Sequence, residues 1–306
     1  MDIRRLELLR ELADRGSVTA VAQATHRTAS AVSQQLKILE REAGVPLTER
    51  SGRGIQLTPA GRELARTATD VATAIERAEA LWEDFRSQPR GEVTLATFPS
   101  GGQMLLPGLL TAISAVPGLA LACSDLDQLI GEPTDLTADF DVVVIDSPEA
   151  RPEWAHRRLA VTELMWEPLD VALPEDHPLG ARRFLRPSDL IDETWIGVPS
   201  GLPFDRILRD IEATNGSPAR IAQRIGDNGI VEALVAAGHG IAILPRYTTR
   251  DRENGLITRP LEGVRSLRLI SALTRPDRAE RPSVKAVIGA LRAEAVRFEH
   301  EHTRVA

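Results

Sequence analysis

Residues 28–44 read TASAVSQQLKILEREAG, and this stretch decides the fold of the first part of the chain. Thr28 is a favourable residue for capping a helix N-terminus, and Gly44 is favourable for ending a helix. The apolar residues Val32, Leu36 and Leu39 recur at helical spacing, so the stretch predicts a helix with one buried face. The opposite face carries small or short polar side chains and one lysine: Ala29, Ser30, Ser33, Gln34 and Lys37.

This polar face has the chemistry of a helix that enters the major groove of DNA. Gln and Ser side chains can form hydrogen bonds with base edges, and a small Ala allows close approach to a thymine methyl group. An ordinary solvated face explains this helix alone equally well, so the neighbouring sequence has to decide. The DNA interpretation predicts contacts from Thr28, Ala29, Ser30, Ser33, Gln34 and Lys37.

The sequence on both sides of this helix predicts a winged helix-turn-helix domain. A helix over residues 2–15 is followed by a short helix over 18–24, with a tight turn before the third helix. Residues 50–54, RSGRG, predict a hairpin tip in which glycine supplies backbone freedom. Because Arg50 and Arg53 flank this tip, we expect them to contact phosphates or the narrow minor groove of double-stranded DNA.

A long helix follows, with Thr58 as its N-cap and Pro59 at its first position. Its apolar residues are separated by alternating steps of four and three, which is a heptad seam. A helix of about 45 Å, at about 1.5 Å per residue, needs a long partner, and a second copy of the same helix would cover the seam. The alternative is that the helix lies on the chain's own body. The seam consists of Leu64, Ala68, Val71, Ile75, Ala78, Trp82 and Phe85.

Length, composition and charge are typical of a folded protein with more than one domain. The 306 residues exceed the length at which one hydrophobic core usually stops growing. Apolar residues make up 42% and charged residues 26%, which excludes a disordered or fibrous chain. The net charge is −7, but residues 1–66 hold 11 basic and 8 acidic side chains, a balance of +3, so the rest carries −10. A basic head on an acidic body is compatible with DNA binding.

The sequence contains no export or membrane signal. Cys123 is the only cysteine, which excludes an internal disulfide framework and a cysteine-rich zinc cluster. The first residues lack the apolar core of a signal peptide, and no run of about 18 apolar residues occurs. We therefore expect a cytoplasmic protein that has no contact with a membrane.

Beyond residue 91, strand and helix patterns alternate, so this part is expected to be α/β. Residues 87–91, SQPRG, break the long helix and are typical of a hinge. Strands are predicted over residues 93–97, 119–123, 141–145, 168–173, 240–244 and 267–273. Helices are predicted over residues 104–115, 203–214, 230–237 and from 282 onwards.

Five short motifs lie in register over about sixty residues of the N-terminal part. They are AVSQQLK at 31–37, LE at 39–40, GVPL at 44–47, ER at 49–50 and LTPAG at 57–61. Together they resemble the amino-terminal signature of LysR-type transcriptional regulators. The chain departs from the family pattern at Thr25, Arg27, Ser30 and Thr48.

The resemblance implies an assembly as well as a fold. In such regulators the long helices of two subunits pair antiparallel, and two heads meet two half-sites of a dyad operator. It implies a homodimer or homotetramer and, for an activator, contact with RNA polymerase. It also implies an all-α-type winged helix-turn-helix domain followed by two α/β lobes of periplasmic-binding-protein type. The implied boundaries are 1–58 for the DNA-binding domain, 59–87 for the linker helix, 88–91 for the hinge and 92–300 for the effector-binding domain, with lobe I at about 92–165 and 269–300 and lobe II at about 166–268.

The stretch VEALVAAGHGIAILP at 231–245 resembles the family's passage from helix to strand in the effector domain. A small-molecule effector between such lobes is held by helix N-termini and strand-end loops, which present free N–H groups. Each candidate could instead cap its own helix. Two acidic side chains among them favour an effector with an amine or guanidinium group. The positions that the resemblance places at the cleft are Thr97, Ser100, Asp125, Ser200, Asp227 and Asn228.

The sequence contains no catalytic constellation. GVPSG at 197–201 places its serine one position too late for the hydrolase motif G-x-S-x-G, and GHG at 238–240 lacks the third glycine of a dinucleotide fingerprint. His300 and His302 are clustered, but such a tail is more often solvated than metal-bound. We therefore predict a regulator and not an enzyme, with no catalytic residue, metal site or cofactor. The alternative is a cytoplasmic small-molecule binding module whose N-terminal domain mediates protein interaction.

Overall fold

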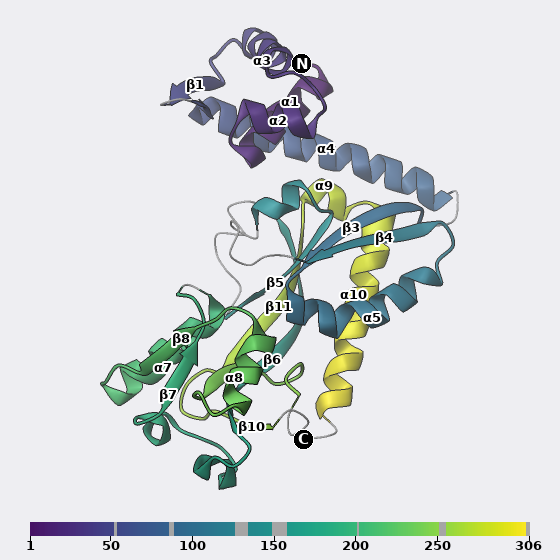
Figure 1. Ribbon diagram of the computed structural model, residues 1–306. Coiled ribbons are helices and arrows are strands. Elements are labelled where there is room, and N and C mark those ends of the chain that lie inside the picture. The colour runs from purple at the N-terminus through teal and green to yellow at the C-terminus, as the bar shows by residue number, and fades with distance from the viewer. Residues whose placement is uncertain are drawn as a thin grey trace.

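The computed structural model describes residues 1–51, 54–85, 89–125, 134–148, 158–200, 202–250 and 255–303. A small N-terminal head is followed by one long helix and by a larger body (Figure 1). The long helix passes between the head and the upper end of the body. We call residues 1–58 the head and residues 89–303 the body.

The three helices of the head begin and end where the sequence predicts. They are α1 (Ile3–Arg15), α2 (Val18–Ala24) and α3 (Ala29–Ala43). The Thr28 hydroxyl accepts a hydrogen bond from the Ala31 N–H at 3.2 Å and so caps α3. Gly44 ends α3 with a φ of 71°, a left-handed conformation that favours glycine. The expected helix-turn-helix is therefore confirmed.

The wing is a two-stranded hairpin of β1 (Thr48–Ser51) and β2 (Gly54–Leu57), which pair antiparallel. Leu47, just before β1, and Leu57 of β2 join the core of the head. That core also holds residues of α1, α2 and α3 such as Leu9, Val21 and Leu36. The hairpin is therefore fixed to the helices by apolar packing.

The long helix α4 (Pro59–Phe85) begins as predicted, because the Thr58 hydroxyl accepts a hydrogen bond from the Gly61 N–H at 3.0 Å. Gly61 lies against the wing, and a Cβ at this position would lie 2.0 Å from the Leu47 carbonyl oxygen. Any larger residue would separate α4 from the wing. The first turns of α4 therefore belong to the head.

The first lobe of the body is an open sheet with helices packed on it. Its elements are β3 (Gly91–Thr97), α5 (Pro99–Ser114), β4 (Leu119–Asp125), η1 (Asp135–Ala138), β5 (Val142–Ser147), β6 (Ala160–Pro174), β11 (Leu267–Thr274), α9 (Pro276–Ala279) and α10 (Pro282–Thr303). The strand order is β6-β11-β5-β3-β4. β3 is parallel to β4 and β5, whereas β11 is antiparallel to β5 and β6. Leu109 of α5 and Leu291 of α10 share one core with Val93 and Leu95 of β3.

The second lobe is built on the far half of β6. Its further elements are η2 (Pro178–Ala181), η3 (Pro187–Leu190), β7 (Thr194–Gly197), α7 (Pro203–Asn215), β8 (Arg220–Arg224), α8 (Asn228–Ala236), β9 (Ala242–Pro245) and β10 (Leu256–Arg259). β9 and β10 pair antiparallel with β6, and β7 is parallel to β8. The lobe has its own core around Trp195, Ile211 and Ile243. Along β6, the strand partners and the hydrophobic core therefore both change from those of the first lobe to those of the second.

Strand β6 is longer than the sequence predicts. Residues 160–168 pair with β11, while residues 169–174 pair with β9 and β10, so one strand runs through both lobes. The expected strand covered only 168–173, because the first part of β6 contains polar residues such as Thr162 and Glu163 and lacks a continuous apolar run. Among the described helices, none combines the length and the apolar character needed to cross a membrane.

Candidate DNA-binding face and ligand cavity

The polar face of α3 is open to solvent. Ser33 is half-buried, and the other predicted contact residues are exposed: Thr28, Ala29, Ser30, Gln34 and Lys37. Within the described part of the chain, the side chains of Gln34 and Lys37 form no hydrogen bond or ion pair. Their donors are therefore available to a ligand, and the face is small enough for close approach to DNA.

The wing is held at a fixed position beside α3. The Glu40 Oε1 atom accepts hydrogen bonds from the Leu47 N–H at 2.9 Å and the Thr48 N–H at 2.8 Å. Arg50 lies on β1 with an exposed side chain. Arg53 lies outside the described residues. Arg50 is therefore exposed to solvent on the hairpin that follows α3, the candidate recognition helix.

Only part of the predicted seam on α4 is available to a second subunit. Ala68 is buried in the core of the head, and Leu64 packs against that core, because the first turns of α4 lie beside α1. Val71 and Ile75 are half-buried, and Ala78 is exposed. Phe85 is the last helical residue, and its side chain lies outside the described part. The large exposed residues are adjacent: Leu81 at 73% and Trp82 at 63%.

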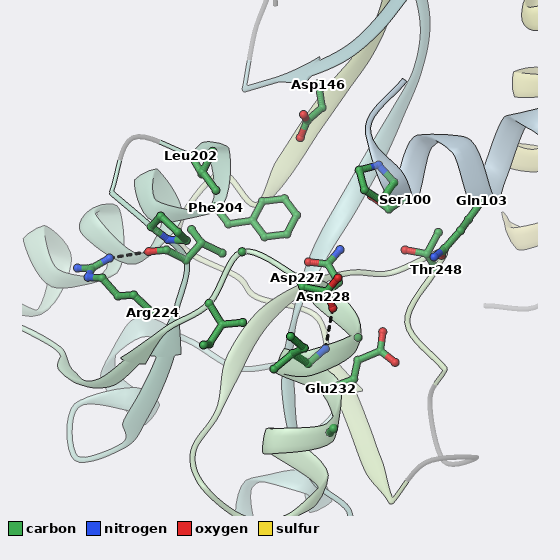
Figure 2. A pocket seen from close by; sticks show the side chains of 18 of the residues that line it. Ser100, Gln103, Asp146, Leu202, Phe204, Arg224, Asp227, Asn228, Glu232 and Thr248 are labelled. Atoms are coloured by element: carbon green, nitrogen blue, oxygen red, sulfur yellow. Dashed lines mark hydrogen bonds between the residues drawn. The ribbon is translucent and has the colours of Figure 1, made fainter. Parts of the chain in front are cut away.

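A cavity of about 1240 Å³ lies between the two lobes (Figure 2). The α5 side contributes Ser100 and Gln103, and the α8 side contributes Asp227, Asn228 and Glu232. The remaining walls come from the strand ends and the start of α7. Of the residues that the sequence predicts to face the cleft, four line this cavity: Ser100, Asp125, Asp227 and Asn228.

Two of the predicted cleft residues do not reach the cavity wall. Thr97 is buried at the end of β3, and its hydroxyl donates a hydrogen bond to the Phe98 carbonyl at 3.3 Å. Ser200 is exposed, and the preceding Val198 and Pro199 form the wall instead. Asp227 combines both predicted roles, since it lines the cavity while its Oδ1 atom caps α8 by accepting from the Ile230 N–H at 2.8 Å.

A buried arginine on the cavity wall lies outside the set that the sequence predicts. Arg268 of β11 is 2% exposed, and its guanidinium donates to Glu167 at 2.7 Å and to Asp146 at 3.2 Å. It also donates to the Ser100 hydroxyl at 2.9 Å. The same guanidinium lies over the ring of Phe98, with 5.0 Å between the guanidinium carbon and the ring centroid. Residues of β5, β6 and α5 thus meet at one side chain.

The ionisation of this cluster is governed by burial. Desolvation raises the pKa of Glu167 above its usual value, although the nearby Arg268 charge acts in the opposite direction. Burial acts to lower the pKa of Arg268, but the two carboxylates outweigh it and the pKa is raised. The guanidinium therefore stays charged, and its strong donors are already occupied by the body itself.

The described residues show no metal centre: no group of three or more His, Cys, Asp or Glu side chains is placed to hold an ion. The polar groups that line the cavity with few internal partners are the carboxylate of Asp125 and the amides of Gln103 and Asn228. This arrangement can bind a polar small molecule between the lobes. Among the described residues, it contains no assembled nucleophile and base.

Both parts of the chain match models of one protein family. The model described as bacterial regulatory helix-turn-helix protein, lysR family, matches residues 3–62, and the LysR substrate binding domain matches residues 86–296. This chain belongs to the LysR family of transcriptional regulators. The LysR head is the DNA-binding helix-turn-helix described above, and the LysR substrate-binding domain is the two-lobed body around the cavity.

Similar LysR proteins span nearly the whole chain. The HTH-type transcriptional regulator CbbR of Xanthobacter flavus is 28% identical over 97% of this chain and 89% of its own length. A full-length OxyR variant from Pseudomonas aeruginosa has a TM-score of 0.65 and 20% identity, covering 95% of this chain and 98% of that one. Full-length CbnR complexed with its target DNA has a TM-score of 0.53 and 24% identity, covering 96% and 100%. The two structures share the fold with this chain, and the named relative is a transcriptional regulator.

Proposed function

We propose that the exposed face of α3 binds the base edges of a dyad operator, with one head of a dimer on each half-site. The observation that carries the proposal is the solvent exposure of Gln34 and Lys37 with donors that no described residue occupies. Arg50 on the wing would contact the DNA backbone and hold the register, and we propose the same role for Arg53, which lies outside the described residues. If the regulator activates transcription, RNA polymerase is its further protein partner.

Two copies of α4 would provide the dimer contact. Ala78, Leu81 and Trp82 lie three and four residues apart, so they occupy one face of the helix and all are exposed. Large apolar side chains at such exposure favour burial against another chain. The described contacts are compatible with a homodimer or a homotetramer built from such dimers.

A small-molecule effector in the cavity would control this binding. Arg224 and Arg268 are already paired with carboxylates of the body, whereas Asp125 has no ion-pair partner among the described residues. Arg250 also lines the cavity and has an exposed side chain, so the cavity offers both an acidic and a basic group. We infer that the Asp125 carboxylate binds an amine or guanidinium group of the effector. A thermal-shift screen of the full chain with matched amines and carboxylates tests this preference, because a bound ligand stabilises the folded state. Stabilisation by carboxylates alone would contradict it.

Fluorescence anisotropy with the DNA upstream of the chain's own gene tests the proposed function. The comparison is a shuffled duplex of equal composition, measured over a range of salt concentrations. We expect the upstream DNA to bind about 10³-fold more tightly or better at physiological salt. Equal affinity for both duplexes would contradict specific binding and would favour a small-molecule binding module whose head mediates protein interaction.

A further inference from the structure

Residues 275–281, RPDRAER, connect β11 to α10 through α9 and lie against α1 and α4 (Figure 1). Five of the seven residues are charged. We call this segment the dock. Its position is unusual for so charged a stretch, because it lies beneath the head and linker helix instead of facing solvent.

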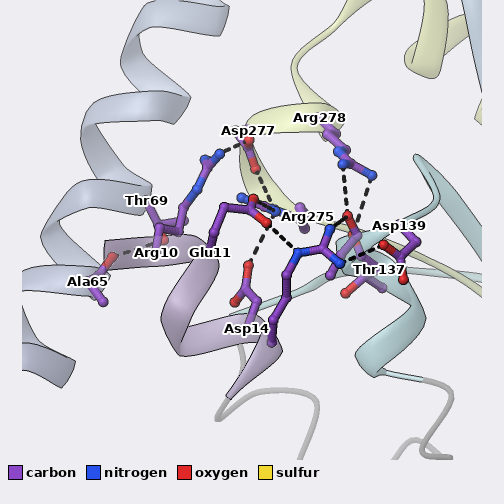
Figure 3. A network of polar contacts seen from close by, with 12 residues as sticks. Arg10, Glu11, Asp14, Ala65, Thr69, Thr137, Asp139, Arg275, Asp277 and Arg278 are labelled. Atoms are coloured by element: carbon purple, nitrogen blue, oxygen red, sulfur yellow. Dashed lines mark hydrogen bonds and ion pairs between the residues drawn. The ribbon is translucent and has the colours of Figure 1, made fainter. Parts of the chain in front are cut away.

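The dock pairs with α1 of the head through buried charges (Figure 3). Arg275 Nη1 lies 3.1 Å from Glu11 Oε1 and 3.2 Å from Asp14 Oδ2. Asp277 Oδ2 accepts from Arg10 Nη1 at 2.8 Å. The side chains of Arg275 and Asp277 are each 5% exposed, so their pairs with Glu11 and Arg10 are largely shielded from water, whereas Asp14 is 37% exposed.

The other end of the dock pairs with the linker helix. Glu280 Oε1 accepts from Arg77 Nε at 2.8 Å, and Arg281 Nη2 donates to Glu76 Oε1 at 2.9 Å. A further contact reaches η1, where Arg15 of α1 donates to the Ala138 carbonyl at 3.1 Å. Head, linker helix and body are thus joined along one line of contacts.

The order of charges makes this contact specific. Arg278 of the dock faces Asp141 of the body. The other four charges are positive at 275, negative at 277, negative at 280 and positive at 281, and each meets an opposite charge on α1 or α4. Both partner helices present adjacent opposite charges, Arg10-Glu11 on α1 and Glu76-Arg77 on α4. If the dock shifted by one residue along α1 and α4, like charges would face each other. Their repulsion disfavours any other register.

We propose that the dock fixes the orientation of the DNA-binding head on the body and thereby sets the spacing between the two half-sites that a dimer accepts. This proposal rests on the proposed function, because it takes α3 as the recognition helix. The face of α3 remains exposed while α1 is docked, so the contact orients the head and does not mask it. An effector that moves the lobe carrying the dock would move the head with it.

Hydrogen exchange of the full chain without DNA tests the dock itself. The variants are Glu76→Arg, Arg281→Glu and the double charge swap, at positions that are partly exposed and therefore compatible with folding. We expect at least about threefold faster exchange over 275–281 and 134–141 in each single variant. Exchange in the double variant should be slower than in either single variant but not fully restored, because Arg281 also lies 3.6 Å from Asp141 of the body. Residues 203–215 of α7 report on folding and should not change. Two results would overturn the proposal: an unchanged exchange rate at the dock in the single variants, or an exchange rate in the double variant that is as high as in both single variants or higher.

Binding-site selection with variable half-site spacing tests the consequence for DNA. Wild type and the double swap should select one spacing, whereas each single variant should accept several spacings with the same half-site sequence. Single variants that keep the wild-type spacing would overturn the proposal. If wild type selected no DNA sequence at all, the proposed function would be contradicted. The hydrogen-exchange experiment would still test the dock, because it uses no DNA.

Discussion

The two ends of β11 carry two buried arginines that serve different regions of the molecule. Arg268 near the start of the strand pairs with Glu167 and Asp146, which both belong to the body. Arg275, just beyond the end, pairs with Glu11 and Asp14 of the head. The chemistry is the same, but the first cluster joins strands within one domain and the second joins two domains. We therefore expect substitutions at the first end to cost more stability than those at the second, which should also disturb the orientation of the head.

The largest effect is expected for Arg268→Met. The substitution leaves two carboxylates buried without their cation, which destabilises a protein by about 3–5 kcal/mol. Urea unfolding of the full chain, followed by tryptophan fluorescence, measures the loss. The matched control is Arg66→Met, since Arg66 and its partner Glu63 are both exposed, at 58% and 69%, and the loss of this pair should cost under about 1 kcal/mol. If both variants lost the same unfolding free energy, the expected difference between buried and exposed arginines would be contradicted.

The next effect concerns assembly. Trp82→Ala removes a large exposed aromatic from α4, and hot-spot residues of this kind contribute about 2 kcal/mol or more to an interface. Analytical ultracentrifugation should show a dimer dissociation constant raised by about thirtyfold or more. Ile191→Ala, an exposed apolar residue of the body, is the control and should leave association unchanged. A dimer that is insensitive to Trp82 would place the subunit contact elsewhere.

A smaller effect is expected at the DNA contacts. Gln34→Ala should reduce discrimination at the base pair it contacts by about 1–3 kcal/mol, because a hydrogen bond to a base edge is lost. Arg50→Ala should weaken binding to all sequences by a similar factor and should reduce the salt slope by about one. Competition binding with single-base operator variants separates the two. If Gln34→Ala preserved base preference, α3 would not read through this face.

The smallest effect is expected for Asp14, which pairs with Arg275 just beyond the end of β11. Burial, together with nearby Glu11, raises the pKa of Asp14, although the nearby Arg275 charge acts in the opposite direction. Burial also opposes ionisation of Asp277, but Arg275 and Arg10 outweigh it and lower its pKa. A raised carboxyl pKa means that ionised Asp14 opposes folding at neutral pH, and this cost disappears as the pH falls through its pKa. Asp14→Asn should therefore change the unfolding free energy at pH 7 by less than about 0.5 kcal/mol.

Asp277→Asn provides the matched contrast at the same site. The lowered pKa of Asp277 means that its stabilising contribution is present above the usual carboxyl range and is lost as the pH falls through its lowered pKa. Removing this charge should cost about 2 kcal/mol at pH 7 and progressively less below about pH 4. Urea unfolding at both pH values measures the difference. A larger loss for Asp14→Asn than for Asp277→Asn would reverse the assignment of the two carboxylates.

The head could be predicted from the sequence because its signals are local. Capping residues such as Thr28 and stops such as Gly44 act within one turn of the helix they bound. The seam on α4 was predicted only in part, because packing against α1 claims Leu64 and Ala68 and periodicity cannot reveal which neighbour covers an apolar face. Local patterns therefore predicted the elements better than the surfaces that join them.

The arginine clusters depend on contacts across long stretches of sequence. Arg268 and Glu167 are 101 residues apart, and Arg275 and Glu11 are 264 residues apart. A usable signal was nevertheless present, since Arg268 and Glu167 are charged residues inside otherwise largely apolar strands. Thr97 and Ser200 do not line the cavity, because a sequence pattern locates the end of a strand but does not show where the last side chain of the strand, or one in the following loop, points.

Selection of binding sites from a random duplex pool tests the central claim most directly. The full-length protein should enrich an inverted repeat whose half-sites lie about one helical turn, or a multiple of one, apart. The Gln34→Ala variant should enrich the same repeat with a relaxed base at one position in each half. A wild-type pool that remains unenriched after repeated rounds would contradict the account.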